Sequence, residues 1–246
     1  MRGGRIRRAA AVAAAIVLTG ALAAGCGRHA GGDEADGAGK AAGTAAAAAY
    51  AKLGDVPESL APDRTTVRVG SPNAEIVVHL YEDMRCPVCK EFETEGGGEG
   101  LRELVLAGQV RVEYTIASFL DDRLGGRGSE KAANALRAAL DAGKFVEYHD
   151  LLFAHQPEES VDGYTDAFLL EQASRLEGLR GPRFDAAVKE MKYRDFVTAS
   201  ENALDADGVT GTPTMKVNGK TVREDLSDGI FDKQTLPMVI GVMAGP

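Results

Sequence analysis

Two cysteines three positions apart are the residues best suited to chemistry in this chain. The segment Cys86-Pro87-Val88-Cys89 follows the apolar, β-branched residues 76–81 and opens the helix-forming residues 90–93. Both sulfurs therefore lie on one side of a helical turn, with Cys86 at its amino end. Free N–H groups and the helix dipole stabilise a thiolate there, and the second thiol can attack a mixed disulfide formed on the first. Pro87 suits the first helical turn because no N–H is needed at that position.

Two other uses of a CxxC segment remain open, a zinc half-site and a structural disulfide. Zinc requires about four ligands, whereas the chain has no second CxxC, and His149 and His155 lie far along the sequence without close metal-ligand spacing. A disulfide across a two-residue loop would constrain little of the unfolded chain. We therefore expect thiol chemistry that requires neither a metal nor another cofactor.

The amino-terminal residues have the pattern of an export signal. Residues 2–8 contain four arginines, and residues 9–24 are apolar or small and end just before Cys26. This predicts a signal peptide over residues 1–25, with a short transmembrane anchor as the alternative. The segment Leu22-Ala23-Ala24-Gly25-Cys26 resembles a bacterial lipobox, although Ala23 stands where leucine is commonest. The resemblance implies that Cys26 is lipidated; an ordinary secretory signal with an incidental cysteine is the alternative.

Composition and charge set the domain layout and exclude one class of partner. Lys plus Arg number 28 against 37 for Asp plus Glu, which gives a net charge of −9 and leaves no basic surface for nucleic acid. Residues 27–62 are rich in Gly, Ala and Asp without apolar periodicity. We expect residues 26–63 to be the lipidated cysteine with a flexible linker, and residues 64–246 to form one folded domain.

A second motif lies near the carboxyl end of the chain. Gly211-Thr212-Pro213-Thr214 precedes a segment in which Asn218-Gly219 separates two alternating runs, which predicts a β-hairpin. A proline at the start of a strand, far downstream of a CxxC segment, resembles the thioredoxin superfamily. The resemblance implies that Pro213 is cis and packs against the redox pair. The backbone of Thr212 can then pair with an extended substrate strand.

The segment between the two motifs has mainly helical periodicity. One strand is expected at residues 110–116, followed by amphipathic helices at residues 129–140, 145–154, 165–176, 182–191 and 193–206. The pattern predicts an α/β protein, and the resemblance implies a thioredoxin-like fold with a helical insertion at about residues 117–207. Over residues 66–246 the chain resembles the DsbA-like family of extracytoplasmic oxidoreductases, in particular its actinobacterial lipoprotein type.

The resemblance implies a role for each motif residue. Cys86 corresponds to the nucleophile, Cys89 to the resolving thiol, and Thr212 with Pro213 to the cis-proline pair that binds substrate. The strongest oxidants of the family have histidine where this chain has Val88. We therefore predict a Cys86 pKa nearer 7 than 3.5, within the range of about 3.5 to 7 for such cysteines.

Another departure concerns the buried acid that thioredoxin-like proteins often carry six residues before the nucleophile. Leu80 occupies that position here. Glu82 shares strand parity with Leu80, so one hypothesis makes it a proton relay to Cys89. A solvated loop acid is the alternative.

Three further features are interpreted as structural. His79 is expected to be a packed strand residue, and His149 a satisfied histidine on an apolar helix. Residues 96–100 are rich in glycine but lack the Lys and Ser/Thr of a phosphate-binding loop. We expect them to break the helix that follows the CxxC segment.

These observations predict a lipid-anchored, extracytoplasmic thiol–disulfide oxidoreductase, with dithiol oxidase as the favoured direction. The expected partners are cysteine-containing exported proteins and a membrane redox protein that recycles Cys86–Cys89. We expect membrane contact only through the lipid, and a monomer. A reductant or isomerase of the same fold is one alternative, and a redox-silent peptide-binding module is another.

Overall fold

The computed structural model describes residues 49–245. Its strands are β1 (Glu58–Leu60), β2 (Val67–Gly70), β3 (Ile76–Asp83), β4 (Val110–Ala117), β5 (Thr214–Val217) and β6 (Lys220–Thr221). Its α-helices are α1 (Pro87–Thr94), α2 (Gly97–Leu106), α3 (Phe119–Leu124), α4 (Gly128–Leu140), α5 (Phe145–Ala154), α6 (Asp166–Ala173), α7 (Pro182–Lys189), α8 (Arg194–Ala206) and α9 (Leu236–Ala244). Leu53–Asp55 and Glu224–Ile230 form 3₁₀ turns.

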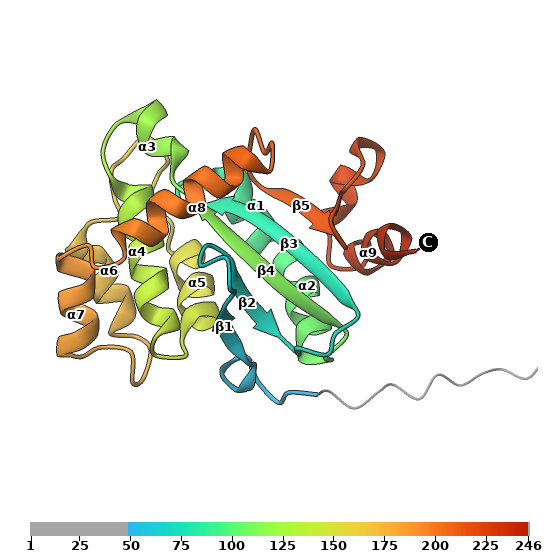
Figure 1. Cartoon of the computed structure of the whole chain (residues 1–246), viewed down its shortest axis with the longest axis horizontal. Helices are drawn as coiled ribbons and strands as arrows, with labels where there is room; N and C mark the ends of the chain where they lie inside the picture. The colour runs from blue at the N-terminus through green and yellow to red at the C-terminus, as the bar shows by residue number, and fades with distance from the viewer. Residues whose placement is uncertain (1–48, 246) are drawn as a thin grey trace, which may run out of the picture. The chain divides into compact units, whose positions relative to one another are not determined.

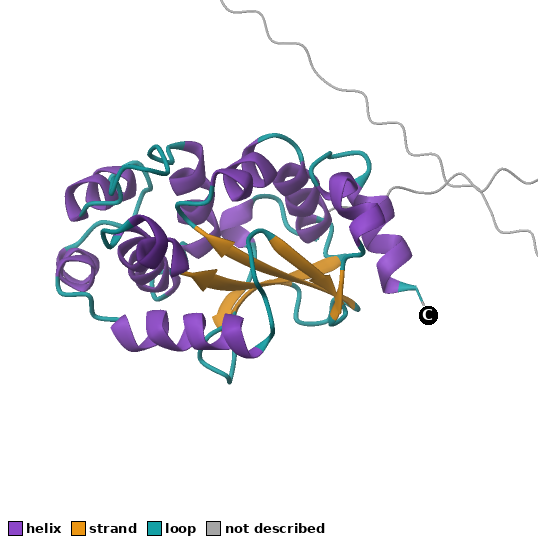
Figure 2. Ribbon diagram, turned by 90° about the horizontal axis from the view of Figure 1, so that it is seen from above, coloured by secondary structure: helices purple, strands orange, loops and turns teal. Residues whose placement is uncertain are grey.

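The strands form one sheet in the order β1-β2-β4-β3-β5-β6, with helices on both of its faces (Figures 1 and 2). Only β3 and β4 are parallel, because α1 and α2 form the crossover between them. Strand β3 lies between β4 and β5, and its last four residues are all buried. The chain leaves β3 at the protected centre of the sheet and enters the CxxC segment there.

The helical insertion predicted at about residues 117–207 is present as α3 to α8, between β4 and β5 (Figure 1). Helix α5 has the predicted bounds, whereas α6 and α7 are shorter than the periodicity suggested. Helix α6 begins at Asp166 because the Thr165 side chain accepts a hydrogen bond from the N–H of Phe168 at 3.2 Å and caps the helix. The α/β class and the thioredoxin-like fold with its insertion are confirmed.

The predicted start of the folded domain at residue 64 is wrong, because the preceding residues belong to the sheet and the core. Strand β1 pairs with β2, and Val56 is buried. The Glu58 carboxylate accepts hydrogen bonds from the N–H groups of Phe145 and Val146 at 2.9 and 2.7 Å, at the amino end of α5. Strand β1 has only three residues, which is too short for the alternation of apolar and polar residues by which a strand is recognised in a sequence. Residues 1–48, with the predicted signal peptide and the predicted lipidation site Cys26, lie outside the described residues.

The glycine-rich segment breaks the helix only at its first position. Helix α1 ends at Thr94, and Gly96 has a φ of 138°, which turns the chain into α2. Gly97, Gly98 and Gly100 lie within α2, so the predicted break is present but is confined to the start of the segment. A side chain at Gly97 or Gly98 would collide with Ile230 or Glu93, so these glycines allow close packing.

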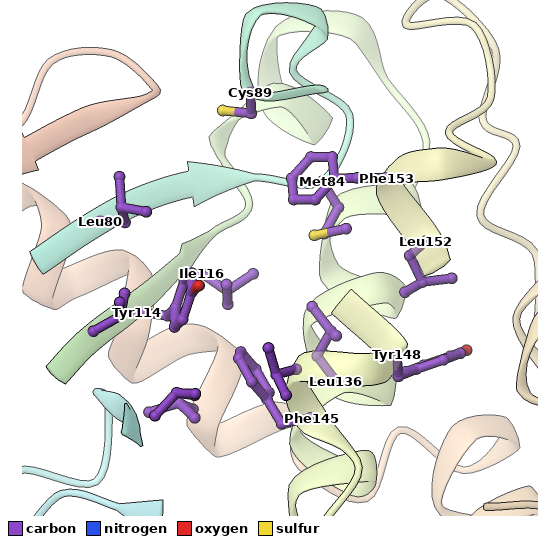
Figure 3. Close-up of a cluster of buried hydrophobic side chains, with 14 of the residues drawn as sticks. Leu80, Met84, Cys89, Tyr114, Ile116, Leu136, Phe145, Tyr148, Leu152 and Phe153 are labelled. Atoms are coloured by element: carbon purple, nitrogen blue, oxygen red, sulfur yellow. The ribbon is translucent and has the colours of Figure 1, made fainter. Parts of the chain in front are cut away.

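One hydrophobic cluster joins the redox pair to the insertion (Figure 3). Leu80 and Ile116 come from the sheet, and Phe145 and Phe153 come from α5. Cys89 belongs to the same cluster and has no exposed surface. The insertion thus covers the sheet face beneath the second cysteine. Within residues 49–245, no helix has the length and apolar character needed to span a bilayer.

Candidate active site

The two cysteines lie at the amino end of α1, as the strand–loop–helix pattern predicted. The loop after β3 is closed by a hydrogen bond from the N–H of Cys86 to the carbonyl of Asp83, at 2.9 Å. Cys86 caps α1, since its sulfur accepts from the N–H of Cys89 at 3.4 Å, and Pro87 begins the helix. Both thiols are free, with Cys86 6% and Cys89 0% exposed.

The surroundings separate the two thiols in acidity. Burial alone would raise the pKa of Cys86. The hydrogen bond that the Cys89 thiol donates to the Cys86 sulfur, together with Thr212 and the N–H groups of α1, outweighs this effect and lowers the Cys86 pKa to about 6. Burial, followed by the Cys86 hydrogen bond and the charge of Glu82, raises the pKa of Cys89 well above its usual value. At neutral pH the outer sulfur is therefore a thiolate and the inner one a thiol. The Cys86 pKa lies nearer 7 than 3.5. This agrees with the expectation from Val88, a half-exposed apolar residue that cannot stabilise the thiolate as a cationic histidine would.

The Gly-Thr-Pro-Thr segment meets the redox pair in space. The Thr212–Pro213 peptide is cis, as the resemblance implied. When Cys86 is protonated, its thiol donates to the carbonyl oxygen of Thr212 at 3.3 Å, across 126 residues of sequence. Strand β5 follows Pro213 directly and pairs with β3, Thr214 opposite Tyr81, which holds the loop beside the sulfur. Thr212 and Pro213 keep partial exposure, so a substrate can reach them.

Glu82 is fully buried in β3, so its interpretation as a solvated loop acid is wrong. It shares a strand face with Leu80, which is also fully buried, and α5 covers that face. Its Oε2 lies 3.1 Å from Nε2 of His149, while its Oε1 has no hydrogen-bond partner. The predicted relay residue is thus buried, with one carboxylate oxygen free to accept a hydrogen bond.

Glu82 belongs to a buried polar cluster with Glu93 of α1, Arg102 of α2 and His149 of α5. Arg102 donates to Glu93 Oε2 at 2.9 Å, and burial raises the pKa of Glu93 to about 8. Burial lowers the pKa of His149, but the carboxylates of Asp150, 3.8 Å from Nδ1, and of Glu82 outweigh that effect and raise it. We call these four residues the Glu82 cluster.

Sequence analysis missed Glu93 and Arg102, although a spacing of four from Cys89 places Glu93 on the same face of α1. Donor atoms of Glu82, Glu93 and His149 lie within 4.8 Å of one another, close enough to hold a metal ion. His149 and Arg102 already form hydrogen bonds with the two carboxyl groups, so contacts among its own members hold the cluster together.

The two histidines expected to be structural are both packed. His79 is stacked on Tyr81 with ring centroids 4.2 Å apart, and its Nε2 lies 2.8 Å from Thr115 Oγ1. His149 is fully buried, and its Nε2 lies within hydrogen-bond distance of Glu82. Its Nδ1 has no hydrogen-bond partner, so the prediction of a histidine with all its hydrogen bonds made is only partly correct.

Comparison with known proteins assigns the family. The thioredoxin family model matches residues 63–234. The reduced DsbA of Mycobacterium tuberculosis, a solved structure, shares 26% identity at a TM-score of 0.55, over 74% of this chain and 100% of that one. Disulfide bond formation protein D of Bacillus subtilis is 23% identical, over 63% of this chain and 68% of that protein. The chain therefore belongs to the thioredoxin family, among its DsbA-like thiol–disulfide oxidoreductases.

Another relative has a different name and a much longer chain. Na(+)/H(+) antiporter NhaA 3 of Salinispora tropica is 34% identical over 163 residues, which cover 65% of this chain. The match spans only 22% of the antiporter's length.

Proposed function

We propose that the protein exchanges the Cys86–Cys89 disulfide with cysteines of exported proteins, outside the cytoplasm and mainly as a dithiol oxidase. The observation that carries this proposal is the contrast between the two thiols: hydrogen bonds, first that of Cys89, lower the pKa of Cys86 to about 6 against the effect of burial, whereas burial raises the pKa of Cys89. A stabilised Cys86 thiolate is a good leaving group and favours the reduced form of the protein, which makes the disulfide more oxidising.

Substrate oxidation then takes two displacements. A substrate thiolate attacks the Cys86 sulfur, the Cys86–Cys89 bond breaks, and Cys89 leaves and takes up a proton. A second substrate thiolate attacks the substrate sulfur of this mixed disulfide and releases Cys86 as a thiolate. The substrate gains a disulfide, and the protein gains two electrons. A membrane redox partner would accept these electrons and restore Cys86–Cys89.

Glu82 is proposed as the residue that exchanges the proton of Cys89. Its charge is among the causes that raise the Cys89 pKa, and its Oε1 has no hydrogen-bond partner. A buried thiol with a raised pKa is a poor nucleophile until a base removes its proton. The carboxylate can accept this proton when Cys89 attacks and return it when Cys89 leaves.

Thr212 and Pro213 are proposed to hold the substrate segment next to Cys86. The two residues are partly exposed and adjoin the sulfur, and the backbone of Thr212 offers hydrogen-bonding groups to an extended chain. Pro213 has no N–H that could compete for the thiolate.

The anchoring of the protein is proposed from the sequence. Residues 1–25 would direct export, and Cys26 would carry the lipid that holds the protein at the outer face of the membrane. Labelled fatty acid should enter the wild-type chain and not the Cys26→Ala variant. Incorporation that persists in Cys26→Ala would refute lipidation at this residue.

The reduction potential of Cys86–Cys89 tests the direction of electron flow. The compact unit that begins at Ala45 would be equilibrated with glutathione buffers, and the free thiols counted by alkylation and mass spectrometry. A potential between about −120 and about −180 mV supports an oxidase or isomerase, whereas about −270 mV would make the protein a reductant.

The Cys86→Ser variant tests the redox-silent alternative. An oxidoreductase loses its cellular role with this change, because serine cannot form the mixed disulfide. A peptide-binding module keeps that role, and this outcome would refute the proposal.

A further inference from the structure

Tyr81 is a buried tyrosine on the face of β3 opposite Leu80 and Glu82. Its hydroxyl donates a hydrogen bond to Oδ2 of Asp207 at 2.6 Å, and Nδ1 of His79 lies 3.3 Å from the same hydroxyl. A carboxylate can only accept, so the tyrosine is the donor in the shorter contact. Burial, followed by the hydrogen bond and the charge of Asp207, raises the pKa of Tyr81, which therefore keeps this proton.

Asp207 begins the segment that carries the cis-proline pair. Helix α8 ends just before Asp207, and β5 starts at Thr214 beside β3 (Figure 1). We call residues 207–214 the proline segment. Residues 210–213, which include the cis-proline pair, take part in no backbone–backbone hydrogen bond within residues 49–245. The place of the pair therefore depends on how the two ends of the segment are held.

Tyr81 contacts both ends of the proline segment. Its hydroxyl holds the Asp207 side chain, and its backbone lies opposite Thr214 in the antiparallel pairing of β3 with β5. Val209 belongs to the same buried apolar cluster as Tyr81. Lys216 supports this arrangement, since its Nζ lies 4.9 Å from the centroid of the Tyr81 ring and donates to the carbonyl of Asp207 at 3.3 Å. Tyr81 therefore ties the start of the segment to the strand that pairs with its end.

The place of the proline segment decides what lies beside the reacting sulfur. The carbonyl oxygen of Thr212 is 3.3 Å from the Cys86 sulfur. A substrate chain that pairs with the backbone of Thr212 is brought to Cys86 only if that backbone is held in place. A displacement of about 1 Å between reacting groups can cost about a hundredfold in rate, so an anchor remote from the sulfur can govern the reaction.

We propose that Tyr81 is a positioning residue, whose hydrogen bond to Asp207 fixes the proline segment and so places the Thr212 backbone for a polypeptide substrate. The inference rests on the proposed thiol–disulfide exchange. Tyr81 is buried, so it acts through the proline segment and not by touching the substrate. It lies on the face of β3 opposite Glu82, so peptide placement and proton exchange depend on different faces of one strand.

The test compares two reductants of the oxidised protein in single-turnover reactions. One is an extended peptide with two cysteines, and the other is dithiothreitol, which has no backbone to pair with Thr212. In each reaction the two thiols of the reductant lose two electrons and two protons and form a disulfide, and Cys86–Cys89 takes up both. Acid quenching, alkylation and mass spectrometry give the two rate constants. Their ratio, peptide over dithiothreitol, measures peptide placement and does not change when a variant is merely less stable but still folded.

Tyr81→Phe removes the hydroxyl and keeps the ring. It should lower the peptide rate about tenfold and the dithiothreitol rate by less than about twofold. Asp207→Ala should lower the ratio equally, whereas Asp207→Asn should keep most of it, because the amide oxygen still accepts the hydrogen bond. Circular dichroism establishes that each variant folds. If Tyr81→Phe does not fold, Asp207→Ala tests the same bond at an exposed residue.

The matched control is Tyr148→Phe, which removes the hydroxyl of another fully buried tyrosine. That hydroxyl donates to the carbonyl of Leu169 at 2.8 Å, within the insertion and away from the proline segment. The control should keep the wild-type ratio, because it loses one buried hydrogen bond without loosening the segment.

The ratio decides whether the bond between Tyr81 and Asp207 has this role. A folded Tyr81→Phe or Asp207→Ala protein with the wild-type ratio overturns the proposal, and so does a Tyr148→Phe protein whose ratio falls as far. An Asp207→Asn protein as impaired as Asp207→Ala overturns the part played by the hydrogen bond. A wild type that oxidises neither the peptide nor dithiothreitol contradicts the proposed function itself.

Discussion

Two buried polar networks flank the redox pair, and they differ in how completely their atoms are bonded. In the network around Arg85, Asp83 accepts hydrogen bonds from Ser129 Oγ and from the N–H groups of Arg85 and Leu120. Both Asp121 oxygens also have donors, and one of these is the Arg85 guanidinium, 2.7 Å away. In the Glu82 cluster, one oxygen each of Glu82 and Glu93 and Nδ1 of His149 have no partner.

This difference indicates different roles. Buried polar atoms without partners are uncommon, because each loses its bonds to water without replacement. In the network around Arg85 every oxygen of Asp83 and Asp121 has a donor, and only the Nε of Arg85 lacks a partner. This network joins β3 to the insertion. The unsaturated Glu82 cluster lies on the side of Cys89, whose thiol must lose and regain a proton. We therefore propose a positioning role for the first network and proton transfer for the second.

The largest effect is expected from removing the arginine of each network in turn. Arg85→Met leaves Asp121 buried without its cation and should cost about 3–5 kcal/mol of unfolding free energy. Arg102→Met should cost less, about 1–2 kcal/mol, because the Arg102 side chain is 23% exposed and water can replace part of its pairing. Urea unfolding of the oxidised proteins measures both losses. If the two variants lost equal amounts of unfolding free energy, the proposed difference between a positioning network and a proton-transfer cluster would be contradicted.

Glu82→Gln should slow the proton-coupled step by about tenfold to a hundredfold while the protein stays folded. The measurement is the decay of the mixed disulfide between Cys86 and a probe, a step in which Cys89 attacks. Glu113→Gln, which changes an ion-paired acid of the same sheet, is the matched control. Equal decay rates in the Glu82→Gln and wild-type proteins would exclude the relay.

The pH dependence of Cys86 alkylation should have a midpoint near pH 6, the value to which its hydrogen bonds lower the pKa. The rate should rise with pH through this midpoint because only the thiolate reacts. Val88→His should lower the midpoint by about one unit, equivalent to about 1.4 kcal/mol, because a cation then adjoins the thiolate. Val88→Gln is the neutral control. A midpoint above pH 8 in the wild type would contradict the proposed contrast between the two thiols.

The smallest expected effect is the pH dependence that Asp83 gives to stability. Burial raises the pKa of Asp83 to about 7, so its contribution is complete below the unfolded value of 3.8 and is lost as pH rises through about 7. The oxidised protein should lose about 1 kcal/mol from this group between about pH 6.5 and about pH 8. Asp83→Asn should remove this part of the slope in urea unfolding series. An unchanged slope would show that Asp83 is ionised throughout the range.

Local patterns predicted much of the fold because they depend on nearby residues. The run before Cys86 and the prolines at positions 87 and 213 placed the redox pair and the loop beside it. Helical periodicity gave the bounds of α5 and the extent of the insertion. Strand β1 was not predicted, because three residues are too few to show an alternating apolar pattern and because their place in the sheet depends on pairing with β2.

The sequence by itself determined the redox pair and its strand–loop–helix setting, and its resemblance to the thioredoxin superfamily implied the cis-proline loop and the fold class. Only the tertiary structure decided which polar residues lie around that pair. Glu82 is buried because α5 covers its strand face, and Glu93 and His149 come from separate helices. Arg85 is buried because two distant segments of the insertion supply its acceptors. The environment of a polar side chain depends on the elements packed against it, and those contacts are long-range in sequence.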